Sequence, residues 1–488
     1  MSRETRLGVA LMGCALTLGL LGDALFQGQA LGLNVPLWTL AFAAALTVLL
    51  HVARAPLHQG RRFMVAPLLV FAALFVWHDS PLLAAANLLA LAAAVSMGAL
   101  RGAGPRLRTA TLSDYGGGFV GAACSAAFGA IGLLMSDIRW NEVVGRGRSE
   151  KVKAVARGLA LGAPLLLLFG GLFVAADAVF KHLVSSTVPT LDASLVERVL
   201  IIGICAWLSG GLLRNLLASR QDDEEVPFAQ ARPRLGALEI CIALGFLDLL
   251  FLAFVLVQFR YLFGGSALVQ SEAHLTYAEY ARHGFFELVS VTALTLPVLL
   301  LADWALGPDG RGRRAFRWLA AVLLALLGVV IASALERMRL YVQHFGLTEL
   351  RLYATGLILW LAVVSSWFAV TVLRGRRHAF AVGALLAGFA ATLALNVLSP
   401  DALIARTNVT RPIVDVSYLA GLSDDAVPTL VSRIASLPAA QQTELARELL
   451  QRDAAAGDWR AWNVSRSRAA DALRTYRGEL QALAERGP

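Results

Sequence analysis

Hydrophobic residues in this chain fall into long blocks that short polar segments separate. A helix needs about 20 mostly apolar residues to cross about 30 Å of hydrocarbon, and a helix satisfies its own backbone groups inside lipid. The pattern therefore predicts an all-α fold, a polytopic transmembrane helical bundle within residues 1–398. The blocks lie at residues 7–26, 36–53, 63–78, 80–100, 119–136, 158–178, 196–217, 236–262, 285–305, 316–335, 352–373 and 379–398.

After residue 398 the pattern changes to the spacing of amphipathic helices. Ser423–Asp424 is placed to cap a first helix, and Pro438 is placed to start a second one. Apolar residues at helical spacing predict a third helix, which would contain Trp462, Leu473, Tyr476, Leu480 and Leu483. We expect residues 399–488 to form a small soluble helical domain.

The basic residues orient these helices, because Lys and Arg in short loops mark the cytoplasmic side of a membrane. They concentrate in segments 54–62, 101–108, 139–157, 214–234, 311–317 and 374–377. All of these segments can be cytoplasmic only if one block between residues 101 and 157 does not cross. The Gly/Ala-rich block 119–136 is predicted to lie at the interface instead. This assignment predicts about eleven spans, a cytoplasmic N-terminus and an extracytoplasmic C-terminus.

The composition agrees with a membrane protein and excludes some partners. Of the 488 residues, 57% are hydrophobic and 16% are charged, against about 45–50% and 25% in soluble domains; the mean hydropathy is +0.65. The net charge of +9 fits the orientation signal and contact with anionic membrane lipids. No basic stripe is interleaved with aromatic residues on a soluble domain, so we expect no nucleic-acid partner.

Charged residues also gather on the side that this topology makes extracytoplasmic. They lie in TYAEYARHGFFEL (276–288), in ERMRLYVQHFGLTELRLY (336–353) and at the start of the tail (396–419). Guanidinium groups suit phosphate and carboxylate ligands, so we predict a site for an anionic ligand such as a lipid headgroup or a polyprenyl phosphate. Its candidate residues are Arg260, Tyr261, Glu279, Tyr280, Arg282, Glu287, Arg337, Arg339, Tyr341, Arg351 and Arg406.

The same residues have a simpler interpretation, because they can pair with one another. Glu279–Arg282 and Glu336–Arg339 are each three residues apart, which places them together on a helix, and tyrosines are common at membrane interfaces. The histidines at 274, 283 and 344 match no zinc-site spacing, and no cofactor motif is present, so we expect neither metal nor cofactor. Glu287 and Asp248 lie at or within apolar blocks, where a carboxylate is either functional or paired.

Three quoted segments carry a resemblance to a known family. YAEYARHGFFEL (277–288), RMRLYVQHFGLTELRLY (337–353) and PDALIARTNVTRPIVDVSYLAGLSDDAVPTL (400–430) resemble bacterial polytopic membrane proteins catalogued as domain of unknown function forty-one seventy-three and its sibling forty-one fifty-three. The resemblance covers about residues 235–430 and implies a bacterial inner-membrane protein with no assigned reaction. Ser399 stands where the family more often has Asn before Pro-Asp.

Three functions stay open at this point. The protein binds or moves an anionic envelope lipid or lipid-linked group at its outward face, it is a membrane-embedded envelope transferase, or it is a structural or signalling partner of other membrane proteins. Against the transferase, the first outward loop (26–38) contains no carboxylate. The sequence assigns no catalytic residue and no oligomeric state.

Overall fold

The fold was examined in a computed structural model of the chain. It describes residues 1–54, 59–98, 112–144, 193–218, 236–263, 285–306, 312–412, 414–452 and 458–486, and the single positions 154, 158, 162, 173 and 177. Within these ranges every regular element is helical, which confirms the all-α prediction.

The apolar blocks become long helices. These are α1 (Arg3–Phe26), α2 (Asn34–Val52), α3 (Gln59–Ala73), α4 (Pro81–Gly98), α5 (Leu112–Gly132), α9 (Ala193–Ala218), α10 (Ala237–Phe263), α13 (Phe285–Leu306), α14 (Arg313–Phe345), α15 (Glu349–Thr371) and α16 (Arg377–Leu398). Ten helices in the described ranges are long and apolar enough to cross a membrane; α3 is shorter, and α5 is among the ten. The chain is therefore a multi-pass membrane protein. The predicted block 158–178 lies outside the described residues, apart from the four single positions 158, 162, 173 and 177.

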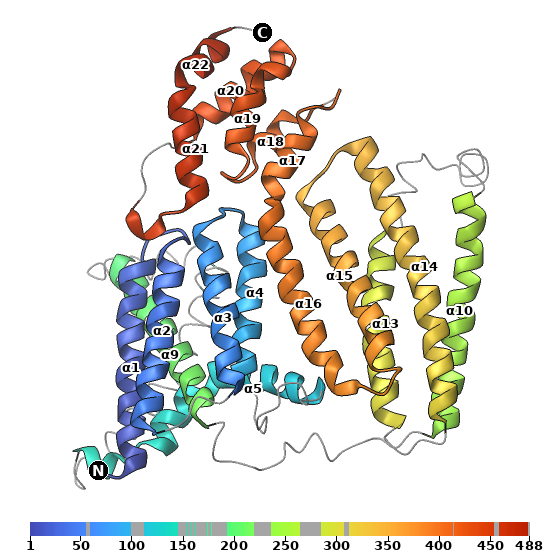
Figure 1. Cartoon of the computed structure of the whole chain (residues 1–488). Coiled ribbons are helices and arrows are strands. Elements are labelled where there is room, and N and C mark those ends of the chain that lie inside the picture. The colour runs from blue at the N-terminus through green and yellow to red at the C-terminus, as the bar shows by residue number, and fades with distance from the viewer. Residues whose placement is uncertain are drawn as a thin grey trace.

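The membrane helices form two bundles with separate hydrophobic cores. The first bundle contains α1, α2, α3, α4, α5 and α9, and the second contains α10, α13, α14 and α15. Helix α16 lies between them (Figure 1). The buried side chains of Asn87 on α4 and Asn396 on α16 exchange two hydrogen bonds, of 3.1 and 2.8 Å. This reciprocal pair fixes α16 to the first bundle.

Helix α5 differs in direction from its neighbours. Figure 1 shows it lying across the ends of the first bundle, at the end of the molecule where the N-terminus lies. Small residues permit this crossing, because a Cβ on Gly211 of α9 would lie 1.9 Å from the Ser125 carbonyl oxygen of α5. Backbones approach this closely only where glycine or similarly small residues meet. The interfacial position of residues 119–136 stays a prediction, which this crosswise direction suits.

The predicted loop 336–353 is wrong in its extent. Helix α14 continues to Phe345 and α15 begins at Glu349, so only residues 346–348 connect them. The ion pair between Glu336 and Arg339 supports the extra turns. Gly346 ends the helix with φ of 82°, a conformation that glycine adopts without strain.

The tail folds around a third core. Its helices are α17 (Pro400–Asn408), α18 (Val416–Ala420), α19 (Val427–Arg433), α20 (Ala439–Gln451), η6 (Trp459–Ala461), α21 (Val464–Thr475) and α22 (Arg477–Glu485). The predicted start after Pro438 is confirmed. The predicted third helix is wrong as one element, since it is divided at Tyr476 into α21 and α22. The solvent location of the tail stays a prediction.

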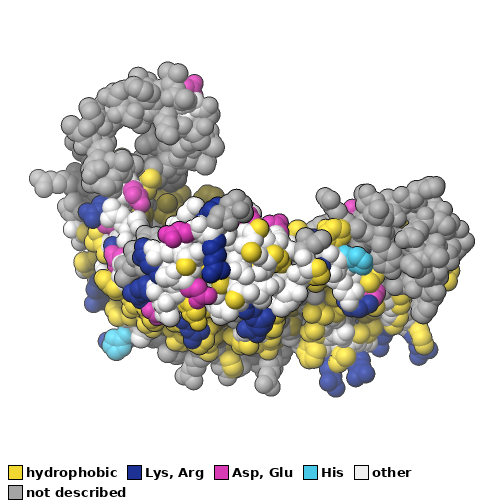
Figure 2. Space-filling model, turned by 90° about the horizontal axis from the view of Figure 1, so that it is seen from above, with side chains coloured by type: hydrophobic (Ala, Val, Ile, Leu, Met, Phe, Trp, Pro, Cys, Tyr) yellow, Lys and Arg dark blue, Asp and Glu magenta, His cyan; other side chains and the backbone are white. Residues whose placement is uncertain are grey.

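The tail and the N-terminus lie at opposite ends of the molecule (Figure 1). The tail lies beside the α1–α2, α3–α4 and α14–α15 connections, whereas the α15–α16 turn with Arg374–Arg377 lies at the far end, where Arg377 pairs with Asp303. Seen from the tail side, acidic and basic side chains are interspersed over the tail and hydrophobic side chains border it (Figure 2). The basic turn at residues 374–377 and the tail are thus separated by the thickness of the bundles.

Candidate functional site

Several residues of the predicted anionic-ligand site lie outside the described residues. These are Glu279, Tyr280 and Arg282. Arg260 and Tyr261 belong to the last turns of α10, but the description does not extend to their side chains. Glu287 is in the first turn of α13 and is exposed.

The remaining predicted arginines contact protein groups in most cases. Arg337 is buried and donates to the Gln258 side-chain oxygen over 2.8 Å. Arg339 forms two hydrogen bonds, of 2.8 and 2.6 Å, to Glu336, which confirms the pairing expected for these two residues. Arg351 lies 4.0 Å from the centre of the Tyr341 ring and donates to two backbone carbonyls of the α14–α15 turn. These contacts agree with the pairing interpretation.

Arg406 is the exception within the described part of the chain. It is exposed on α17, and no hydrogen bond or ion pair to a described residue involves it. Asp248 in the middle of α10 is the opposite case, since it is buried and neither carboxylate oxygen has a hydrogen-bond partner among the described residues. The anionic-ligand set stays a prediction.

A denser polar site lies where the tail meets the membrane helices. Its first part, the α3–α4 contact, joins tail residues to the connection between α3 and α4. The Asp425 carboxylate accepts hydrogen bonds from the His78 ring at 3.0 Å and the Ser465 hydroxyl at 2.5 Å. Burial acts to raise the pKa of Asp425, but the hydrogen bonds from His78 and Ser465 hold that pKa below its usual value. Asp425 is therefore an ionised anchor of the tail.

Asn463 completes the α3–α4 contact. Only 1% of its surface is exposed, and its amide donates to the carbonyls of Phe75 and His78 over 2.8 and 2.7 Å. Its side-chain oxygen accepts from the Ser465 and Arg466 backbone N–H groups and so caps α21. One side chain thus supplies hydrogen bonds to free backbone carbonyls in the α3–α4 connection and to free backbone N–H groups at the start of α21.

The second part, the α14–α15 contact, uses side chains that bind backbone. Asn408 accepts from the Leu347 N–H at 2.9 Å and donates to the Leu347 carbonyl at 2.7 Å. The Arg411 guanidinium donates to the carbonyls of Val342, Gln343 and His344, at 2.7 to 3.0 Å. These carbonyls belong to the last turn of α14, where a positive charge is favourable.

A third group, which we term the junction cluster, lies between these contacts. It consists of Ser80, Glu349, Tyr353 and Asp401. Glu349 and Tyr353 are one turn apart on α15, so they share a face. The Glu349 and Asp401 carboxyls lie side by side, and the Ser80 hydroxyl lies next to Tyr353 and Asp401. Burial raises the pKa of Asp401, and the nearby Asp425 charge adds to this effect, while hydrogen bonds from Ser423 oppose it.

The junction cluster is not fully satisfied by the protein. Ser80 Oγ, Tyr353 Oη and Asp401 Oδ1 are buried, and although Ser80 lies next to both Tyr353 and Asp401, none of the three atoms forms a hydrogen bond of normal geometry within the described chain. No ion pair among the described residues joins Glu349 or Asp401 to a basic side chain. Buried polar atoms are nearly always paired with protein, water or ligand, so these groups have capacity for a polar partner.

An apolar cavity of about 600 Å³ begins at the same tyrosine. It is lined by α4, α5, α15 and α16, from Tyr353 near the tail to Ala381 near the far end of α16. Residues 381 to 395 of α16 line it over about 21 Å, at 1.5 Å of rise per residue. Its lining residues Leu89, Phe119 and Leu357 are 71%, 52% and 44% exposed, so the cavity opens on the apolar outer surface.

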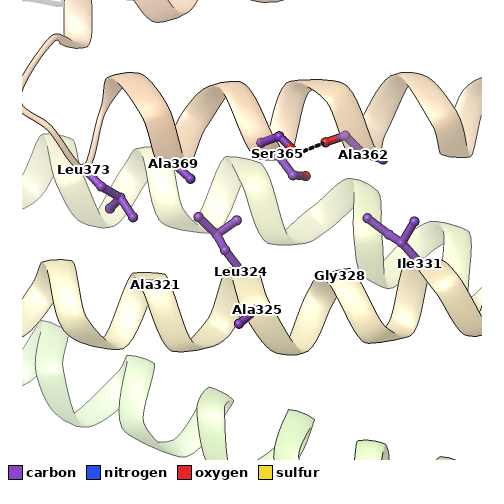
Figure 3. A pocket seen from close by; sticks show the side chains of 10 residues that line it. Ala321, Leu324, Ala325, Gly328, Ile331, Ala362, Ser365, Ala369 and Leu373 are labelled. Atoms are coloured by element: carbon purple, nitrogen blue, oxygen red, sulfur yellow. Dashed lines mark hydrogen bonds between the residues drawn. The ribbon is translucent and has the colours of Figure 1, made fainter.

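A second cavity, of about 360 Å³, lies between α14 and α15. Figure 3 shows Leu324 and Ile331 of α14 projecting into it towards α15. Alanines and Gly328 form much of its wall. It does not include a member of the junction cluster, and it therefore serves as a comparison for the larger cavity.

Sequence reasoning missed most of this site. Glu349 and Asp401 were visible as outward carboxylates, and residues 400–430 carry part of the family resemblance. The polar residues His78, Asp79 and Ser80 were also visible in the sequence, where the apolar blocks 63–78 and 80–100 meet. Nothing in the sequence pattern places His78 beside Asp425, which is 347 residues away.

Comparison with known proteins gives one family. The model of a family described as Domain of unknown function (DUF4153) matches residues 65–432. No curated protein and no solved structure matches the chain. The matched region includes α3 to α16, the junction cluster and the α14–α15 contact.

Proposed function

Because the chain belongs to the family Domain of unknown function (DUF4153), we propose its function from its own geometry: it holds a membrane lipid in the cavity between α4, α15 and α16. The lipid chain occupies the apolar part, and the headgroup lies at the junction cluster. Tyr353 carries the proposal, since it lines the cavity and belongs to the cluster at the same time. Cavities of about 300–1,000 Å³ with few polar groups are typical of ligand sites.

The proposal includes the membrane in which the protein lies and its orientation across that membrane. The basic residues of the α15–α16 turn, which lies at the end opposite the tail, support a cytoplasmic N-terminus and an extracytoplasmic tail. The family resemblance supports the bacterial inner membrane. The headgroup would then be bound at the outward face. This agrees with the lipid hypothesis drawn from the sequence, although at other residues.

The test measures lipid that stays with the purified protein. Gly388 lines the cavity, and a Cβ there would lie 3.7 Å from Trp360 Nε1, an ordinary contact. A Gly388→Leu side chain fills the cavity, so native mass spectrometry should show several-fold less bound lipid than in the wild type. A second variant, Ala93→Phe, fills it from α4.

The matched control is Gly328→Leu in the α14–α15 cavity, where a Cβ meets nothing within 4 Å. This variant should keep its lipid. Equal lipid content in the wild type and in both cavity-filling variants, each folded by circular dichroism, would overturn the proposal.

The anionic-ligand hypothesis is tested separately, at its own residues. Arg337→Ala removes the buried guanidinium, and Arg433→Ala on α19, which removes an exposed one outside the candidate set, is the control. A selective loss of acidic lipid from Arg337→Ala would support an anionic site in the second bundle. The same lipid composition in both variants would oppose it.

A structural role is the second candidate. Trp459 and Trp462 of the tail are 62% and 48% exposed, and aromatic residues are enriched at protein interfaces. Under this alternative, a Trp459→Ala/Trp462→Ala double variant would lose a co-purifying membrane protein and keep its lipid. The transferase alternative would add a reaction at the bound headgroup, for which the described residues offer no separate support.

A further inference from the structure

The charge of the junction cluster indicates which headgroup it accepts. Glu349 and Asp401 place two carboxyls side by side, and the ionised Asp425 lies close enough to raise the pKa of Asp401. The basic groups at the junction are engaged elsewhere: His78 with Asp425, Arg466 with Asp79 and Arg452 with Asp424. The cluster therefore has an excess of carboxyl groups over basic groups and an excess of hydrogen-bond acceptors.

This excess discriminates between headgroups. A phosphate that approached Glu349 and Asp401 without a cation would be repelled, since like charges at short range are strongly unfavourable. A primary ammonium carries three N–H donors and a positive charge, and it forms strong hydrogen bonds to carboxylates. A quaternary ammonium has the charge without the donors. The cluster is thus complementary to a primary ammonium in particular.

The hydroxyls without hydrogen bonds among the described residues make the cluster complementary to a zwitterionic headgroup, which carries a phosphate as well as an ammonium. Tyr353 Oη and Ser80 Oγ, both buried, can each donate one hydrogen bond. A phosphate linked to the ammonium by two carbons can accept from Tyr353 while the ammonium lies at the carboxyls. Because Tyr353 also lines the apolar cavity, the acyl chains and the headgroup of one molecule can occupy adjoining spaces.

We propose that the junction cluster binds the primary ammonium of an aminophospholipid such as phosphatidylethanolamine, through Glu349 and Asp401. This assignment rests on the proposed lipid-binding function and specifies its ligand class. It also gives the two carboxyls at this buried position a counter-charge, which the described protein residues do not supply.

The experiment is a lipid competition with the full-length protein. Purified protein is stripped of lipid in detergent and mixed with equal amounts of phosphatidylethanolamine, phosphatidylcholine and phosphatidylglycerol with identical acyl chains. Retained lipid is then measured by mass spectrometry. Phosphatidylethanolamine should be enriched about tenfold over the other two lipids, the effect of one charge-assisted hydrogen bond.

Variants separate the headgroup from the chain. Glu349→Gln and Asp401→Asn keep the shape of the side chains and remove the charge, so selectivity should fall while total lipid is kept. Glu444→Gln on α20 removes an exposed carboxylate of the tail and should leave selectivity unchanged. Retention of the three lipids in their input ratio by the wild type would overturn the ammonium assignment.

The outcomes also separate this inference from the proposed function. Loss of lipid in Gly388→Leu without any headgroup selectivity in the wild type keeps the cavity function and rejects the ammonium. A last experiment measures binding of soluble glycerophosphoethanolamine, which has the headgroup without the acyl chains. If it binds in a Glu349-dependent manner while no lipid is retained, the ammonium site stands and the lipid function fails.

Discussion

The two contacts of the tail with the membrane helices use different chemistry. The α3–α4 contact is made by side chains that meet other side chains, with Asp425, His78 and Ser465 at its centre. The α14–α15 contact is made by Asn408 and Arg411, which bind backbone groups of a turn and a helix end. Each side chain named here forms at least one hydrogen bond across its contact, although the buried His78 Nε2 has no partner among the described residues. The junction cluster between the contacts has three such buried atoms, Ser80 Oγ, Tyr353 Oη and Asp401 Oδ1, and this larger deficit marks it as the place for a ligand.

The largest expected effect comes from removing the central residue of the α3–α4 contact. Asn463→Ala loses a helix cap and two hydrogen bonds to buried carbonyls, a cost of about 3 kcal/mol. Hydrogen exchange of residues 459–486 should become on the order of 100-fold faster, because the tail opens locally.

Asn408→Ala is the matched change in the α14–α15 contact. It loses two hydrogen bonds to the Leu347 backbone, about 1–2 kcal/mol, and exchange should rise in residues 346–349. If either variant loosens both contacts equally, the contacts are one cooperative unit and the distinction between them is wrong.

A smaller effect should come from the charge of Asp401. Its pKa is raised in the folded protein by burial, so its contribution to stability is greatest at low pH. That contribution declines as the pH rises from about 4, the ordinary pKa of an aspartate, through the raised pKa of the folded protein.

Asp401→Asn has no such decline. Its melting temperature in lipid-free detergent should therefore improve relative to wild type as the pH increases, and the loss of repulsion from the ionised Asp425 acts in the same direction. Added phosphatidylethanolamine should reduce the difference in melting temperature between Asp401→Asn and the wild type at pH 7. If this difference in melting temperature does not change with pH, burial does not destabilise the ionised form of the Asp401 carboxyl.

The smallest expected effect concerns the covalent connection between membrane part and tail. Ser399 joins α16 to α17 with φ of 48°, a left-handed conformation that costs a residue with a side chain about 1 kcal/mol and that asparagine tolerates better. Ser399→Asn should raise the free energy of unfolding by about 0.5 kcal/mol. Ser399→Ala, which has no such tolerance, should give no gain, and thermal unfolding of the two variants distinguishes them.

Sequence patterns predicted the helices well and the site poorly. The apolar blocks correspond to membrane helices because their length is a local property, set by the hydrocarbon thickness. Helix boundaries were predicted wrongly where the apolar pattern ended before the helix did. Helix α14 runs ten residues beyond its apolar block, because charged residues continue the helix. Of the candidate site, Arg337, Arg339 and Arg351 were singled out from the sequence, yet the sequence predicted a partner only for Arg339, which has Glu336 three residues before it.

By itself the sequence determined that this chain is a helical multi-pass membrane protein with a helical tail, and it identified the family. The fold class follows from composition and spacing within short windows, which hydrophobic burial controls directly. The family follows from the resemblance of three segments to known members. Only the tertiary structure decided that His78 meets Asp425, that Ser80 and Tyr353 meet Asp401, and that a cavity begins at Tyr353. Those contacts join residues far apart in the chain, and packing of whole helices brings them together.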